Sequence, residues 1–206
     1  MLRILGRRTS SNVQKVLWTL TELGGIPFSR EDVGGPFGGN NNPDYLAMNP
    51  NGLVPTVIDG PLVMWESNSI CRYICNKHGG EKLYPAAPER RVLIERWMDW
   101  QLSTVAPALV PLFLLLIRTP AEKRDPALIE KLRKDAEAPF RILETHLAGR
   151  KYLEGDDATL ADIGPAIWTY RWFTLGYADP NGNLAAWYRR MTERPAFREH
   201  IMIPLA

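Results

Sequence analysis

The chain has 206 residues, of which 45% are hydrophobic and 23% are charged. This composition is that of a globular protein with one large or two small domains, and it excludes a disordered chain, a collagen-like chain and a disulfide-rich scaffold. The formal net charge is only +2, which indicates neither nucleic acid nor an anionic membrane as a partner. Two cysteines and three histidines leave little material for a metal cluster.

Up to about residue 85, short apolar runs alternate with helical patterns. Apolar residues at helical spacing predict a helix over 13–23, and a second helix is expected over 67–77. The sequence predicts strands over 2–5, 28–33, 54–58 and 62–65. A loop rich in Gly and Asn covers 34–43. The expected order is βαβ, loop, ββα, which is a small α/β domain.

After residue 85 every strong period is helical. Long helices are expected over 88–117, 122–148 and 157–173, with a shorter one over 183–193, and residues 83–89 are the expected linker. Pro107 and Pro111 should bend the first of these helices. The longest apolar stretch, 105–117, is too short for a membrane span and favours a buried helix. Since the first residues lack the apolar core of a signal peptide, we expect a cytoplasmic protein.

The strongest local motif is NPNGLVPTVIDG at residues 49–60. A trans proline that opens a strand is the usual interpretation of such a Val54-Pro55 pair. A cis bond would instead turn the N–H and C=O of Val54 out of the sheet, free to pair with an extended peptide-like ligand. The residues alone favour the trans form.

Two polar segments precede helices. Glu66 and Ser67 stand at the start of the helix over 67–77, where a carboxylate could receive an ammonium group and the helix N–H groups a carboxylate. Ser10, Ser11 and Asn12 stand before the first helix, where hydroxyl and amide groups can stabilise an anion such as a thiolate. The residues alone favour plain helix capping for both segments.

Taken together, these features resemble the cytosolic glutathione transferase superfamily, and within it the bacterial serine-type (theta/phi-like) members. The segments NPNGLVPT, WESNSICRYI and GDDATLADI carry the resemblance, which extends over essentially the whole chain. It implies a thioredoxin-like glutathione-binding domain over 1–80 and an all-helical domain over 88–206 that forms the site for the electrophile. It also implies that the bond before Pro55 is cis.

The resemblance implies a role for each matching residue. The frame Ser-x-x-x-Arg-x-Val places Ser10 at the catalytic serine, with Ser11 as a competitor shifted by one residue, and Asn12 at a second sulfur contact. Val54, beside Leu53 and Pro55, would pair its backbone with the cysteinyl part of glutathione. Glutathione-binding positions at the two ends of the ligand would be Glu66 and Ser67 for the γ-glutamyl group, and Asn40 and Asn41 near the glycyl carboxylate.

The chain departs from the family pattern at Leu53, where many members have Lys or Gln, so one glycyl-side contact is lost. No tyrosine lies in the catalytic turn and no cysteine precedes the first helix, which argues against tyrosine-type and cysteine-type members. Cys71 and Cys75 are interpreted as buried free thiols rather than a redox pair. Thr159 and Asp162 are interpreted as a capping box that serves folding.

The expected function is a glutathione transferase of detoxification, with glutathione as co-substrate, no other cofactor and no metal. It would join glutathione to a small apolar electrophile held by side chains from 103–117 and 165–173, and it would act as a homodimer. Two alternatives stay open: a glutathione-dependent disulfide reductase or peroxidase, and a non-catalytic adaptor of the same fold.

Overall fold

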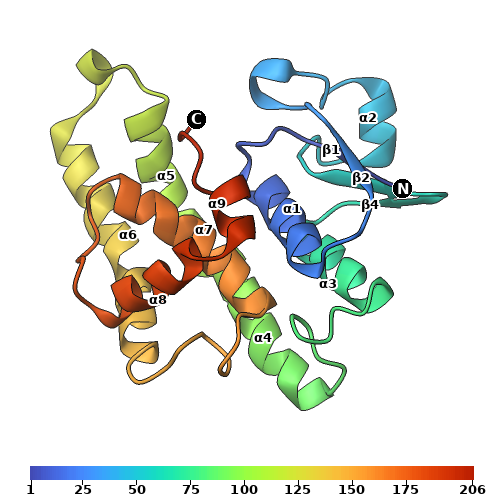
Figure 1. The fold of residues 1–206 in the computed structure, drawn as a ribbon. Helices are drawn as coiled ribbons and strands as arrows, with labels where there is room; N and C mark the ends of the chain where they lie inside the picture. The colour runs from blue at the N-terminus through green and yellow to red at the C-terminus, as the bar shows by residue number, and fades with distance from the viewer. The chain divides into compact units, whose positions relative to one another are not determined.

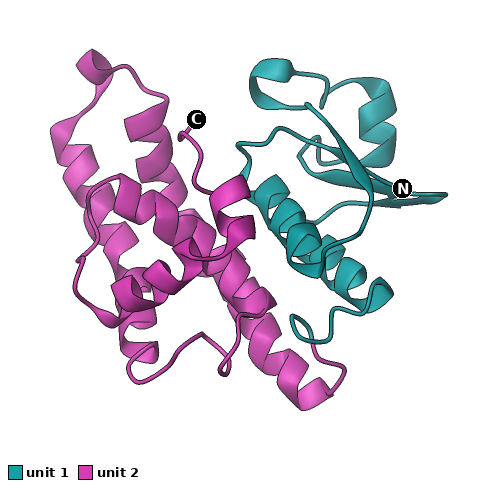
Figure 2. Cartoon of the chain, in the orientation of Figure 1, with its two compact units in different colours: residues 1–84 teal, residues 85–206 magenta.

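The computed structural model describes residues 1–206, which form two compact units, Met1–Tyr84 and Pro85–Ala206 (Figure 2). The first unit is a thioredoxin-like domain with a four-stranded mixed sheet, and the second is entirely helical. The predicted fold class is therefore confirmed.

The sheet of the first unit has the strand order β2-β1-β3-β4. Strand β1 (Leu2–Leu5) pairs in parallel with β2 (Phe28–Glu31) and antiparallel with β3 (Thr56–Asp59), which pairs antiparallel with β4 (Leu62–Met64). Strand β3 begins two residues later than predicted because Pro55 has no N–H to give to the ladder. Strands β2 and β4 also end earlier than predicted, at Glu31 and Met64.

Helices α1 (Ser11–Leu23) and α3 (Ser67–Lys77) pack against each other on one side of this sheet, and α2 (Pro43–Met48) lies on the other side (Figure 1). The sequence analysis did not predict α2, which is too short to show a helical period. Its signal is Pro43 at the first helical turn, where the missing N–H costs nothing. A 3-10 turn over Gly35–Phe37 was also not expected. Fully buried side chains of the unit include Ile4, Val13, Val16, Val57, Ile70 and Ile74.

In the second unit, α4 (Pro88–Trp100), a π-helical turn (Gln101–Val105) and α5 (Ala106–Ile117) form one continuous helix of 30 residues. By length and composition alone it could cross a membrane. It is nevertheless the core helix of this unit, because α5 packs on α6 (Pro126–His146) and α4 packs on α7 (Leu160–Thr174). The predicted helix over 88–117 is confirmed. The π-helical turn comes immediately before the first turn of α5, which contains Pro107.

Helices α8 (Asn183–Thr192) and α9 (Pro195–His200) and a short 3-10 turn (Ala121–Lys123) complete the second unit. The predicted capping box at the start of α7 is confirmed, because Thr159 and Asp162 exchange side-chain and backbone hydrogen bonds there. Most of the segment 165–173 is buried in the core of this unit, and only Tyr170 and Phe173 are half-buried.

Candidate functional site

The first helix begins at Ser11, with Ser10 as its N-cap residue in an extended conformation. The Ser10 side chain is only 9% exposed, makes no capping hydrogen bond and has no hydrogen-bond partner within the chain. Side-chain capping by Ser10, which the sequence allowed, is therefore absent. The Ser10 hydroxyl therefore has no hydrogen-bond partner of its own, and neither has the half-buried hydroxyl of Ser11.

Asn12 joins the start of α1 to the start of α3. The Ser67 hydroxyl donates a hydrogen bond to Asn12 Oδ1 over 3.3 Å. The amide nitrogen of Asn12 has no partner within the chain. Asn12, predicted as a sulfur contact, and Ser67, predicted for the γ-glutamyl end, therefore lie next to each other, and the amide nitrogen of Asn12 is a free donor.

The start of α3 is built differently from the expected plain cap. Glu66, not Ser67, is the N-cap residue, and it has a positive φ of 69°, unusual for a residue with a side chain. Such backbone strain collects at functional sites, where the surrounding structure holds it in place. The first N–H groups of α3 have no acceptor within the helix, so this end is suited to an anion, while the exposed Glu66 carboxylate is suited to a cation.

The peptide bond between Val54 and Pro55 is cis, as the family resemblance implies. Neither the N–H nor the C=O of Val54 has a hydrogen-bond partner in the chain. An unpaired donor and acceptor on one half-buried residue can pair with an extended peptide in the manner of an added strand.

These groups meet at one pocket of about 40 Å³ within the first unit. Its lining residues are Asn12, Asn49, Asn51, Leu53, Val54, Pro55, Glu66 and Ser67. Six of the eight were named from the sequence, whereas Asn49 and Asn51 were not. Both belong to the quoted NPNG segment, whose Asn residues signal a turn held by side-chain hydrogen bonds.

Three predicted residues do not line this pocket. Ser10 lies at the N-terminus of α1 and is not among the residues that line the pocket. The amide nitrogen of Asn40 donates to Gly52 O over 2.7 Å, so its role inside the chain is to hold the loop before Val54. Asn41 is exposed.

The cysteines are poorly suited to redox chemistry. Burial raises the pKa of Cys71 to about 11 and the pKa of Cys75 to about 12, so both thiols are protonated at neutral pH. The chain also contains no group of three or more His, Cys, Asp or Glu side chains that could hold a metal ion.

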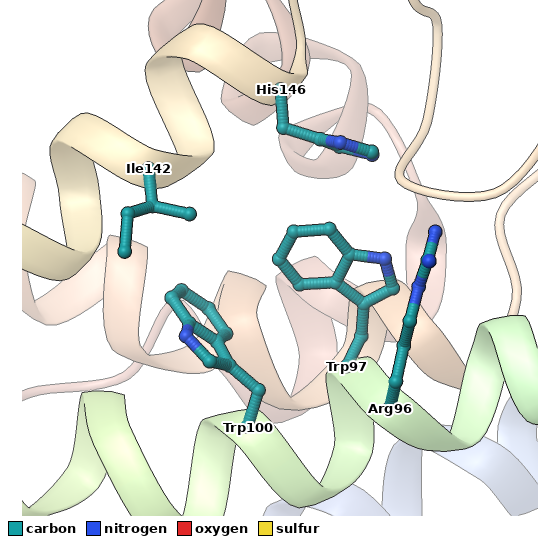
Figure 3. Close-up of a pocket in the computed structure, with 5 residues that line it drawn as sticks. All are labelled: Arg96, Trp97, Trp100, Ile142 and His146. Atoms are coloured by element: carbon teal, nitrogen blue, oxygen red, sulfur yellow. The ribbon is translucent and has the colours of Figure 1, made fainter.

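A larger pocket, of about 320 Å³, lies between α4 and α6 in the second unit (Figure 3). Its walls are Arg96, Trp97, Trp100, Ile142 and His146. Arg96 and the Trp97 indole both donate to Glu154 Oε1, over 2.6 and 2.7 Å. Both side chains are therefore hydrogen-bonded to Glu154 within the unit. None of the five lining residues falls within 103–117 or 165–173, the segments expected to hold the electrophile.

The fold and the pocket of the first unit define a thioredoxin-like domain with a pocket beside a cis-proline. Family models for the N-terminal and C-terminal domains of glutathione S-transferases match residues 9–77 and 105–195. Glutathione S-transferase GstB of Escherichia coli (strain K12) is 42% identical over 100% of both chains, and glutathione S-transferase 3 of Zea mays is 34% identical over 99% of this chain and 95% of that one.

Among solved structures, the theta class glutathione S-transferase of Xanthomonas axonopodis pv. citri with glutathione bound is 42% identical. The match covers 100% of this chain and 99% of the Xanthomonas chain, with a TM-score of 0.93. The chain therefore belongs to the glutathione S-transferase family, and it is a transferase that uses glutathione.

Proposed function

We propose that the pocket of the first unit binds glutathione through its peptide backbone. The observation that carries this proposal is the unpaired N–H and C=O of Val54, which stands in one pocket with Glu66 and Ser67. Val54 would pair with the cysteinyl residue of the ligand, as one strand pairs with another. Glu66 would receive the γ-glutamyl ammonium group, and the start of α3 with Ser67 would receive the γ-glutamyl carboxylate.

Ser10 and Asn12 would stabilise the sulfur as a thiolate. A free thiol with a pKa of ~8.5 is only about 3% ionised at pH 7, and a pKa lower by ~2 units would make it about three quarters ionised. The Ser10 hydroxyl and the Asn12 amide are donors without acceptors in the chain, and the positive end of α1 begins beside them. The thiolate would then attack an electrophilic carbon, with the leaving group departing from that carbon.

The second substrate would be a small apolar electrophile that meets the helical unit along α5. One face of α5 and the preceding π-helical turn carries a row of exposed residues, formed by Ser103, Pro107, Pro111 and Leu114. Such a row offers apolar contact with few hydrogen-bonding groups, which fits an apolar substrate better than a polar one.

Two assays test this function. The protein is mixed with glutathione and either an aryl halide or a small disulfide, and product is followed for each. We expect turnover of the aryl halide. Turnover of the disulfide alone would assign the reductase alternative, and failure to bind immobilised glutathione would point to the adaptor.

We further propose a cytoplasmic homodimer, with glutathione as the co-substrate and no metal. Light scattering should give about twice the chain mass of 23.4 kDa. A mass of one chain would contradict the dimer.

A further inference from the structure

A cluster of three buried polar side chains, Tyr45, Asn49 and Thr56, adjoins the pocket of the first unit, and Asn49 also lines that pocket. They are 4%, 2% and 0% exposed. They come from α2, the loop that follows it and β3, and two of them, Tyr45 and Asn49, hydrogen-bond to one backbone oxygen, that of Leu53.

Two donors share this oxygen. The Tyr45 hydroxyl donates to Leu53 O over 2.6 Å, and the Asn49 amide nitrogen donates to the same atom over 2.8 Å. Thr56 links the two donors, because its hydroxyl accepts from the Asn49 amide over 3.2 Å and donates to Tyr45 over 2.9 Å.

The orientation of each donor is also fixed. The N–H of Asn51 donates to Asn49 Oδ1 over 3.2 Å, so the amide nitrogen of Asn49 must face Leu53 and Thr56. Burial raises the pKa of Tyr45, so its hydroxyl keeps its proton as a donor at neutral pH.

The oxygen of Leu53 and the N–H of Val54 belong to one planar peptide unit. In a trans peptide these two groups point in opposite directions. Holding the oxygen from the buried side therefore aims the N–H of Val54 away from the cluster, and this N–H has no partner in the chain. Hydrogen bonds to the carbonyl also polarise the peptide unit and make its N–H a stronger donor.

Side-chain packing holds this peptide unit weakly on the Leu53 side. The Leu53 side chain is 66% exposed, so it is not anchored in the core. The two hydrogen bonds on its oxygen hold the Leu53 half of the peptide plane, while the half-buried Val54 side chain lies close to Gly6 and Gly34 at the other half.

We propose that Tyr45 and Asn49 are positioning residues that aim the Val54 N–H at the carbonyl oxygen of the cysteinyl residue of glutathione. This inference rests on the proposed glutathione site. It assigns to a buried cluster an effect on ligand affinity, although its two hydroxyl-bearing residues, Tyr45 and Thr56, do not line the pocket.

The test compares Tyr45→Phe with Tyr73→Phe, both in the first unit. Each variant removes one phenolic hydroxyl, but the Tyr73 hydroxyl donates to Asp59 Oδ2 over 2.8 Å and takes no part in the cluster. Glutathione binding is measured by calorimetry, and the amide proton of Val54 is followed by NMR during the titration. Asn49→Ala is a second variant that removes the other donor.

We expect Tyr45→Phe and Asn49→Ala each to raise the Kd for glutathione about three- to tenfold, and Tyr73→Phe to change it less than twofold. The shift of the Val54 amide proton on binding should shrink in the two cluster variants. For Tyr45→Phe, whose side chain does not line the pocket, the kcat at saturating glutathione should stay within twofold of that of the unchanged protein. Where one cluster variant fails to fold, the other decides.

Ser67→Ala distinguishes failure of the positioning role from failure of the proposed glutathione site. If it weakens binding while the cluster variants bind as the unchanged protein does, the positioning role is overturned and the glutathione site stands. If Ser67→Ala also binds normally, the proposed site itself fails. Weaker binding in Tyr45→Phe with an unaltered Val54 shift would mean that the cluster only stabilises the fold, and would overturn the inference.

Discussion

The buried polar network around Asp162 in the helical unit and the one around Leu53 in the first unit end differently. In the helical unit, the Asp162 carboxylate is 0% exposed and accepts hydrogen bonds from the N–H groups of Leu153 and Thr159 and from the Trp187 indole, at 3.0, 2.9 and 2.9 Å. This network is closed, because every donor in it meets an acceptor inside the unit. The network around Leu53 instead ends on a peptide unit whose N–H has no partner.

The difference separates folding elements from binding elements. A closed buried network has nothing left to offer a ligand, whereas one with an open end fixes the direction of a group that only a ligand can satisfy. Thr159 and Asp162 are conspicuous in the sequence, but they belong to the first kind. Tyr45 and Asn49 are inconspicuous, but they belong to the second.

The largest effect on stability should come from removing the Asp162 carboxylate at the centre of the closed network. Asp162→Ala removes the acceptor of four buried donors, the N–H groups of Leu153 and Thr159, the Thr159 hydroxyl and the Trp187 indole, which should lower the free energy of unfolding by about 3–5 kcal/mol. Urea unfolding followed by tryptophan fluorescence measures this loss. A loss below about 1 kcal/mol would show that the network is not what holds the start of α7.

A smaller effect should follow from changing the groups that meet the ligand. Glu66→Ala and Ser67→Ala should each weaken glutathione binding by about 1.5–3 kcal/mol, or roughly ten- to 150-fold, because each removes a charge-assisted hydrogen bond. The kcat at saturating glutathione should change little, since the γ-glutamyl end is bound alike in the ground state and the transition state. The two variants should unfold at nearly the same urea concentration as the unchanged protein. Unchanged affinity in both would remove these residues from the site.

The smallest effect should come from a surface pair in the first unit. The Lys77 ammonium and the Tyr73 hydroxyl hydrogen-bond to Asp59 and lower its pKa below the usual 3.8. A carboxylate whose pKa is lowered by folding stabilises the fold above its unfolded pKa, and this contribution is lost as the pH falls toward its folded pKa. The side chain of Lys77 is 44% exposed, so Asp59→Asn should cost about 1 kcal/mol or less at pH 7.

The measurement for this pair is the unfolding free energy of both proteins from pH 7 down to pH 3. The difference in unfolding free energy between the unchanged protein and Asp59→Asn should shrink below about pH 4. A difference that grew toward low pH would contradict the assignment.

The sequence predicted most of the elements and much of the site. Periodicity found α1 and the long helix over 88–117, because both bury one face along many turns. It missed α2, which has six residues and buries only Tyr45. The resemblance named Val54, Glu66 and Ser67, which share one pocket.

The positioning cluster could not be predicted in the same way. Tyr45 and Thr56 are eleven residues apart, and no period joins them, since only the turn of the chain between α2 and β3 brings them together. Asn49 gave a local signal, because an Asn before Pro50 favours a side-chain turn, but the sequence does not say what its amide would hold.

The central claim is that Ser10 acts on the sulfur of bound glutathione, and the most direct measurement is the thiolate absorbance of the glutathione complex against pH. Ser10→Ala should raise the pKa of the bound thiol by about 1–2 units and leave the affinity nearly unchanged, because one hydrogen bond to an anion is worth ~1.5–3 kcal/mol. Ser11→Ala should shift the curve much less, and Asn12→Ala should add to the Ser10 effect if the amide also reaches the sulfur. An upward shift in Ser11→Ala beside an unshifted Ser10→Ala curve would contradict the account and move the catalytic role one residue along.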